Sequence, residues 1–100
     1  QRTVVRRQRL LPVKPDERAR AIRAFERRAR EGQAQLFIET PYRNVKLAEQ
    51  LLQLCAPQTM LTVACDLTAP DETVLTRSIA DWRRSRLPEL NKRPAIFILG

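Results

Sequence analysis

Histidine is absent from this 100-residue sequence, and cysteine and glycine occur only twice each. Without His, the chain cannot supply a Ser-His or Cys-His catalytic pair or a histidine-ligated metal site. Two Cys are too few for a disulfide framework or a four-Cys zinc site. Two Gly leave no Gly-rich loop that could cradle phosphates. The sequence therefore predicts no catalytic residue and no metal ligand of its own.

Long apolar runs are missing as well. No stretch approaches the ~20 residues that a membrane-spanning helix needs, and no apolar segment follows the basic N-terminus as a secretory signal requires. We therefore expect a cytoplasmic protein with no membrane partner. Cys55 and Cys65 both lie among apolar neighbours, which predicts buried thiols in a reducing compartment.

The charge that is present is unevenly distributed. Residues 1–30 hold 11 Lys or Arg against 3 Asp or Glu, whereas residues 31–100 hold 8 of each, so the whole net charge of +8 lies in the first third. A localised basic region can neutralise RNA phosphates. Because no aromatic residue is interleaved with the Arg run for base stacking, a solvated Arg-rich helix face remains the alternative.

A first helix is predicted to begin at Pro15, which suits the first helical position, and to end before Gly32. Asp16 and Glu17 would meet the positive end of its dipole. Its apolar face is formed by residues three and four positions apart: Ala19, Ile22, Phe25 and Ala29.

A second helix is expected between Asn44, as its cap, and Pro57, which stops it. A third, short helix opens with Ser78 and Asp81 in a capping-box pattern. Residues 1–9 form either a short edge strand or a frayed terminus. Strands are expected at residues 36–38, 60–65, 73–76 and 94–99.

This alternation predicts an α/β domain, a mixed, partly antiparallel sheet with helices packed on its faces. Strands 60–65 and 73–76 are joined by a short loop and should pair antiparallel, whereas strands joined by helices should run parallel. Strand 94–99 is almost entirely apolar, which is typical of a strand covered on both faces.

Polar residues follow two of the predicted strands at their carboxyl ends. Glu39 and Thr40 follow strand 36–38, and residues 66–68 follow strand 60–65. Ligand sites of α/β sheets gather just beyond the carboxyl ends of strands. Turn and cap formation is the alternative explanation for the same residues.

Around these positions the sequence resembles a known family. Residues 36–44, Leu-Phe-Ile-Glu-Thr-Pro-Tyr-Arg-Asn, resemble the Tyr-Glu-Ser-Pro-His-Arg stretch of the ribosomal RNA small-subunit methyltransferase I type. Residues 11–14, Leu-Pro-Val-Lys, resemble its Leu-Pro-x-Lys, and residues 65–68, Cys-Asp-Leu-Thr, its Arg-Glu-Leu-Thr-Lys segment. Residues 94–100, Pro-Ala-Ile-Phe-Ile-Leu-Gly, are similar to the Pro-Ala-aliphatic-Gly strand of the wider tetrapyrrole methylase superfamily.

The resemblance covers about residues 10–100. Residues 3–10, Thr-Val-Val-Arg-Arg-Gln-Arg-Leu, stand in place of the family's Phe-x-Phe-x-Gly-Phe strand before Leu-Pro, so this first strand is either altered or absent. Thr-Pro-Tyr-Arg-Asn stands in place of Ser-Pro-His-Arg. These departures point to a sister subgroup.

The resemblance implies an S-adenosyl-L-methionine-dependent methyltransferase whose cofactor lies in a cleft between two domains. This chain would be the C-terminal half, residues 10–100 after a basic segment 1–9, with the N-terminal cofactor-loop domain absent and no activity by itself. The expected partners are that N-terminal domain, a second copy in a homodimer, and RNA, which the basic first third favours over a tetrapyrrole. A non-catalytic basic RNA-binding domain and a dimerisation domain remain the alternatives.

The resemblance also assigns roles by motif position. Cofactor contacts, made chiefly by backbone and small apolar groups, would come from Glu39, Thr40, Leu67, Thr68, Pro94 and Ala95. Tyr42 and Arg43 would contact the substrate. Since the small side chain of Ala95 lets its strand approach a ligand, Ala95→Trp is expected to abolish cofactor binding with the fold intact.

Overall fold

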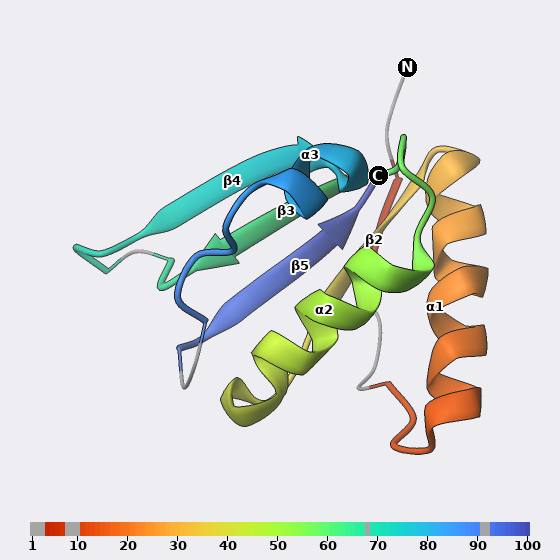
Figure 1. Ribbon diagram of the computed structural model, residues 1–100, viewed down its shortest axis with the longest axis horizontal. Coiled ribbons are helices and arrows are strands. Elements are labelled where there is room, and N and C mark those ends of the chain that lie inside the picture. The colour runs from red at the N-terminus through yellow and green to blue at the C-terminus, as the bar shows by residue number, and fades with distance from the viewer. Residues whose placement is uncertain (1–3, 8–10, 68, 91–92) are drawn as a thin grey trace.

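The computed structural model describes residues 4–7, 11–67, 69–90 and 93–100, which form a five-stranded sheet and three α-helices (Figure 1). The strands are β1 Val4–Arg7, β2 Gln33–Ile38, β3 Met60–Cys65, β4 Thr73–Ser78 and β5 Ala95–Leu99. The helices are α1 Pro15–Arg30, α2 Asn44–Leu54 and α3 Ile79–Arg84, with a short 3-10 helix, η1 Pro41–Arg43, directly before α2. None of the described helices has the length and apolar character that crossing a bilayer requires.

The sheet order is β1-β2-β5-β3-β4. β1 pairs with β2 in parallel, and every other neighbouring pair is antiparallel. The predicted antiparallel pairing of β3 with β4 is confirmed, and each pair of strands joined by a helix runs in the same direction. Because β2 and β3 flank β5 and both oppose it, their carboxyl ends meet at one edge of the sheet, on either side of the start of β5.

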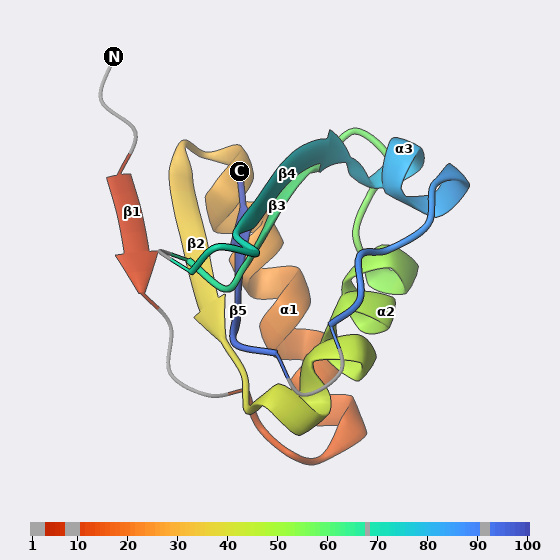
Figure 2. The same cartoon turned by 90° about the vertical axis from the view of Figure 1, so that its left-hand side faces the viewer.

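The hydrophobic core lies on one face of this sheet. Phe37, Phe97 and Val63 are in register across β2, β5 and β3, and each side chain is at most 1% exposed. All three helices pack on this side, as Figure 2 shows. On α3, Trp82 is fully buried and its indole Nε1 donates to the Leu61 carbonyl at 2.8 Å. Each large side chain buried here contributes about 1.5–3 kcal/mol.

The opposite face is apolar as well, but no helix in the described part of the chain covers it. Ile38, Ile96 and Ala64 are in register there, followed along the strands by Leu36 and Ile98. The predicted α/β class with a mixed, partly antiparallel sheet is confirmed. The expectation that the last strand is covered on both faces is wrong for the described chain, because the helices gather on one side and both Ile side chains of β5 stay partly exposed.

Several local predictions are confirmed. Pro15 occupies the first helical position of α1, and Gly32 follows the helix with a left-handed φ of 92°. Ser78 caps α3, since its hydroxyl accepts from the Asp81 amide at 3.1 Å. β2 begins at Gln33, three residues earlier than expected, because backbone pairing with β1 recruits polar residues that no hydrophobic pattern marks.

The predicted capping role of Asn44 is wrong. The 3-10 helix η1 runs directly into α2, so Asn44 is the first residue of α2 rather than its cap. Its buried side-chain amide donates instead to the Arg93 carbonyl. Of the two alternatives for residues 1–9, the edge strand is confirmed for residues 4–7, which form β1. Residues 1–3 and 8–9 lie outside the described part of the chain.

Candidate functional site

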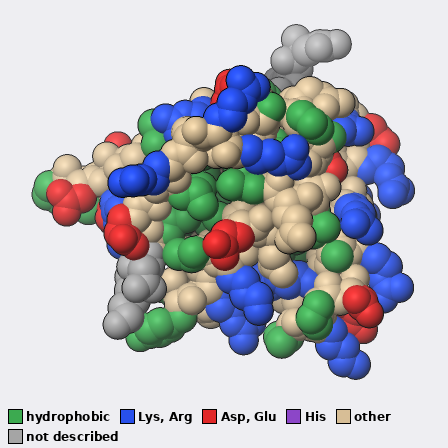
Figure 3. Space-filling model, viewed as in Figure 1, with side chains coloured by type: hydrophobic (Ala, Val, Ile, Leu, Met, Phe, Trp, Pro, Cys, Tyr) green, Lys and Arg blue, Asp and Glu red, His purple; other side chains and the backbone are tan. Residues whose placement is uncertain are grey.

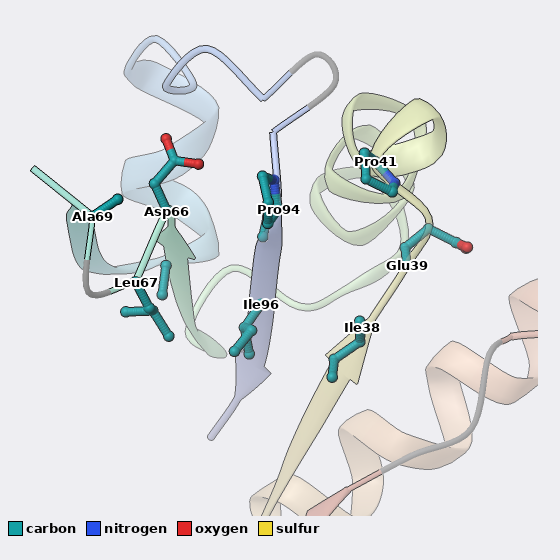
Figure 4. A pocket seen from close by; sticks show the side chains of 10 residues that line it. Ile38, Glu39, Pro41, Asp66, Leu67, Ala69, Pro94 and Ile96 are labelled. Atoms are coloured by element: carbon teal, nitrogen blue, oxygen red, sulfur yellow. The ribbon is translucent and has the colours of Figure 1, made fainter. Parts of the chain in front are cut away.

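A pocket of about 420 Å³ opens at the edge where β2 and β3 end and β5 begins (Figure 4). Its lining is mostly apolar. The lining residues are Ile38, Glu39 and Pro41 on the β2 side, Ala64, Asp66, Leu67 and Ala69 on the β3 side, and Pro94, Ala95 and Ile96 around the start of β5.

The floor of the pocket is the exposed face of the sheet. Ile38, Ile96 and Ala64 lie side by side on three neighbouring strands, because the register pairs each with the next. Pleating points these three side chains away from the helices. The result is a flat apolar surface, which suits the face of a planar ring.

One wall is set by an unusual backbone conformation. Asp66 has a φ of 51°, in the left-handed region that Asp tolerates better than most residues. Its amide donates to the Pro94 carbonyl at 3.0 Å, and its carboxylate pairs with Arg93 Nε at 2.7 Å. That hydrogen bond raises the pKa of Arg93. These contacts turn the chain sharply out of β3 and place Leu67 in the pocket wall.

The opposite wall is held by a buried ion pair. Figure 4 shows the Glu39 side chain directed away from Leu67 and Ile96. Its Oε2 lies 3.0 Å from Arg18 Nη2, and its Oε1 accepts from the Thr40 amide at 2.9 Å. Arg18 Nε also donates to Gln50. Both charged side chains are at most 5% exposed, so this pair ties the end of β2 to α1 and α2.

Sequence reasoning missed Arg18, which it did not distinguish from the other arginines of the first third. A signal for its burial was present, because Arg18 precedes Ile22 by one helical turn and therefore shares the apolar face of α1. It also missed Ile38 and Ile96, whose alternation with Phe37 and Phe97 places them together on the other face.

Four of the six predicted cofactor contacts line the pocket: Glu39, Leu67, Pro94 and Ala95. Thr40 is exposed and does not line it, although its neighbours on both sides do, and Thr68 lies outside the described residues. The two predicted substrate residues, Tyr42 and Arg43, are exposed and lie outside the pocket.

The structure corrects the reasoning about Ala95. Its side chain shares the helix-covered face with Phe97 and Leu99 and belongs to the core, at 5% exposure. The large side chain of Ala95→Trp would therefore enter the core, and the expectation that the fold stays intact is wrong. Ala64 is the small residue whose side chain forms part of the pocket floor.

Neither thiol is poised for chemistry. Cys55 and Cys65 are free and buried, as predicted. Burial, reinforced by nearby Glu26, raises the pKa of the Cys55 thiol to about 12, and burial also raises the pKa of Cys65. A thiol that stays protonated is a poor nucleophile and a poor metal ligand. Among the described residues, no three Cys, Asp or Glu side chains gather as a metal site requires.

A second, smaller hollow of about 210 Å³ lies between the first turns of α1 and α2. It shares Arg18 with the ion pair behind the main pocket. Its lining residues are Val13, Pro15, Arg18, Arg43, Lys46 and Gln50.

No family model and no curated protein matches the chain. The structure matches the methyltransferase CobJ with a TM-score of 0.57 at 19% identity, over 97% of this chain and 41% of that one. Uroporphyrin-III C-methyl transferase from Thermus thermophilus, complexed with S-adenyl homocysteine, matches 67% of this chain and 30% of its own at 22% identity and a TM-score of 0.42. The native form of the same enzyme matches with a TM-score of 0.44 at 20% identity, over 67% of this chain and 29% of that one. The chain therefore has the fold of a segment of CobJ and spans about two fifths of that protein's length.

Proposed function

We propose that this chain is the C-terminal half of an S-adenosyl-L-methionine-dependent methyltransferase and forms one wall of the cleft that holds cofactor and substrate. The observation that carries the proposal is the pocket of about 420 Å³ at the shared carboxyl edge of β2 and β3. The sequence resemblance assigns cofactor contacts to the same edge. The CobJ-like fold is consistent with this role.

The lining of the pocket fits an adenosyl group. The flat floor of Ile38, Ile96 and Ala64 suits the face of an adenine ring. Backbone groups of Glu39 and Leu67 at the two walls can satisfy the ring's polar edge. S-adenosyl-L-methionine supplies an electrophilic methyl group when bound, so the residues of this chain need only orient the reactants and exclude water.

The uncovered sheet face supports a second domain as partner. Leu36, Ile38, Ile96 and Ile98 are apolar yet only partly buried, and a contiguous exposed apolar surface usually marks an interface. We propose an N-terminal domain of the same enzyme as its cover, with the cofactor pocket at the border between the two domains. Assembly of the whole enzyme as a homodimer in the cytoplasm is part of the same proposal.

RNA is the substrate class that the charge favours over a tetrapyrrole. Lys and Arg side chains gather over α1 (Figure 3). Arg20, Arg23, Arg27 and Arg30 form one exposed stripe along this helix. The same stripe supports the second candidate function, a non-catalytic RNA-binding domain, which would show strong salt dependence without any cofactor affinity.

Calorimetric titration of S-adenosylhomocysteine into the full product of the reading frame tests the proposal. We expect binding by the parent protein, no detectable binding by Ala64→Trp, which fills the pocket from its floor, and parental binding by Ala64→Ser, which leaves it open. Absence of binding by the parent would overturn the methyltransferase assignment and favour the RNA-binding domain. Parental affinity in Ala64→Trp would remove this pocket from the cofactor site.

A further inference from the structure

The smaller hollow concentrates positive charge next to the pocket. Three of its six lining residues are cationic, and none is acidic. The charge of Arg18 is balanced by Glu39. Arg43 and Lys46 are exposed and form no ion pair with any described residue. The hollow therefore presents two uncompensated positive charges.

The two helices that border the hollow differ in how they begin. The first turn of α1 carries Asp16 and Glu17, and its last turn is basic, as the helix dipole favours. The first turn of α2 contains Lys46 and no acidic residue, and Arg43, at the N-cap, provides no side-chain cap. Cations at the positive end of a helix are unfavourable. A local arrangement that costs stability points to a functional role, and a bound anion would relieve this one.

Along the chain, an exposed aromatic residue lies between a residue of the pocket and a residue of the hollow. Pro41 lines the pocket and Arg43 lines the hollow. Tyr42, between them in η1, is 78% exposed. An aromatic side chain beside cations is the usual platform on which proteins stack the bases of single-stranded RNA.

We infer that the hollow binds a phosphate of single-stranded RNA and that an adjacent base stacks on Tyr42. This inference rests on the proposed function and names the substrate contacts on this side of the cleft. Arg43 and Lys46 would neutralise the phosphate, while the Arg18–Glu39 pair forms the wall shared with the cofactor pocket. A tetrapyrrole carboxylate could also pair with the two cations. The basic stripe on α1 and the stacking surface favour RNA, because a nucleic-acid strand offers further phosphates to that stripe.

The test measures binding of a fluorescently labelled single-stranded RNA of about 12 nucleotides to the full product of the reading frame at several salt concentrations. In the double variant Arg43→Gln/Lys46→Gln, we expect an affinity loss of about tenfold and a salt slope shallower by about 0.7, the value for one phosphate on a single strand. Arg84→Gln/Arg86→Gln removes the same charge at the end of α3, outside both the hollow and the α1 stripe, and should cost much less.

Tyr42 provides an independent measurement. Tyr42→Ala should weaken RNA binding with an unchanged salt slope, because stacking releases no counterions, and Tyr42→Phe should bind as the parent does. Misfolding cannot produce this pattern, since the double variant removes cations from a helix N-terminus and should leave Tm unchanged or higher.

Equal losses in the two double variants would overturn the inference, because binding would then depend on overall charge alone. It would also be overturned if uroporphyrin III bound and lost affinity in Arg43→Gln/Lys46→Gln while RNA binding did not change. Failure of the inference leaves S-adenosylhomocysteine binding intact in every variant. Failure of the proposed function abolishes that binding in the parent protein, so the two failures are distinguishable.

Discussion

The two faces of the sheet are built from the same strands and both carry apolar side chains, yet their environments differ. On one face Phe37, Phe97 and Val63 are buried beneath three helices. On the other, Ile38 and Ile96 remain partly exposed at the floor of the pocket. An apolar strand face therefore predicts a cover, but it does not tell whether that cover is the chain's own helices, a ligand or another domain.

The largest expected effect separates the two faces by stability. Phe97→Ala should lower the free energy of unfolding by about 3–5 kcal/mol, because it leaves a cavity in a packed core. Ile96→Ala, one residue earlier on the uncovered face, should cost about 1 kcal/mol in this chain, because little packing is lost. Urea denaturation of both variants measures the difference. Comparable losses would show that the second face is also covered in solution, as a dimer would do.

The next effect concerns the ion pair at the border of the pocket. Arg18→Met should cost about 3 kcal/mol, because it leaves the Glu39 carboxylate buried without its partner. The double variant Arg18→Met/Glu39→Gln should recover part of this loss, since no charge then remains buried. Urea denaturation of the parent, the two single variants and the double variant forms a double-mutant cycle, which gives the interaction free energy between Arg18 and Glu39. Additive losses would mean that the two side chains do not interact in solution.

A smaller effect appears at alkaline pH on the helix-covered side. The pKa of Cys55 rises from 9.0 to about 12 on folding, chiefly through burial. Its contribution to stability is therefore complete below pH 9 and is lost as the pH rises from 9 towards 12. Thermal unfolding at pH 8, 9 and 10 should show a decline in the parent that is shallower in Cys55→Ala. Identical pH dependence in both proteins would contradict the buried environment of this thiol.

The smallest expected effect tests how the last helix is held on the covered face. Ser78→Ala removes the hydroxyl that accepts from the Asp81 amide and should cost about 1 kcal/mol. Ser78→Asp keeps an acceptor at the cap and should restore most of the stability. Circular dichroism melts of both variants check the ordering. A neutral Ser78→Ala would show that the packing of Trp82 alone holds α3 in place.

Much of the local structure could be predicted from sequence because it depends on neighbours along the chain. Pro15, Gly32 and Ser78 set helix ends through their own dihedral angles and hydrogen bonds. Asn44 was misjudged because the geometry that precedes it, a 3-10 turn, changed which residue could cap the helix. The predicted caps are correct where the side chain bonds to a neighbour along the chain, as Ser78 does. The prediction failed at Asn44, whose side chain bonds to the distant Arg93 carbonyl.

The site was predicted at the level of the sheet edge but not of individual side chains. Glu39 lies in the pocket wall, but its carboxylate is bound to Arg18, a residue 21 positions away. Ala95 lies at the pocket, yet its side chain belongs to the core. The side chain of Ala64, on the neighbouring strand, forms part of the pocket floor. Motif position identifies which backbone segment reaches a site. The direction of each side chain depends on strand register, which links residues far apart in sequence.

The sequence by itself determined the order of helices and strands, the antiparallel pairing of β3 with β4, the buried thiols, and the strand ends at which a pocket forms. Each of these follows from short-range patterns of polarity and from residues with restricted backbone dihedrals. Only the tertiary structure decided which apolar face became the core, which arginine was buried, and that Arg43 and Lys46 share a hollow. Those outcomes depend on the side of the sheet to which the helices fold back, and that side is chosen by the packing of all the elements together.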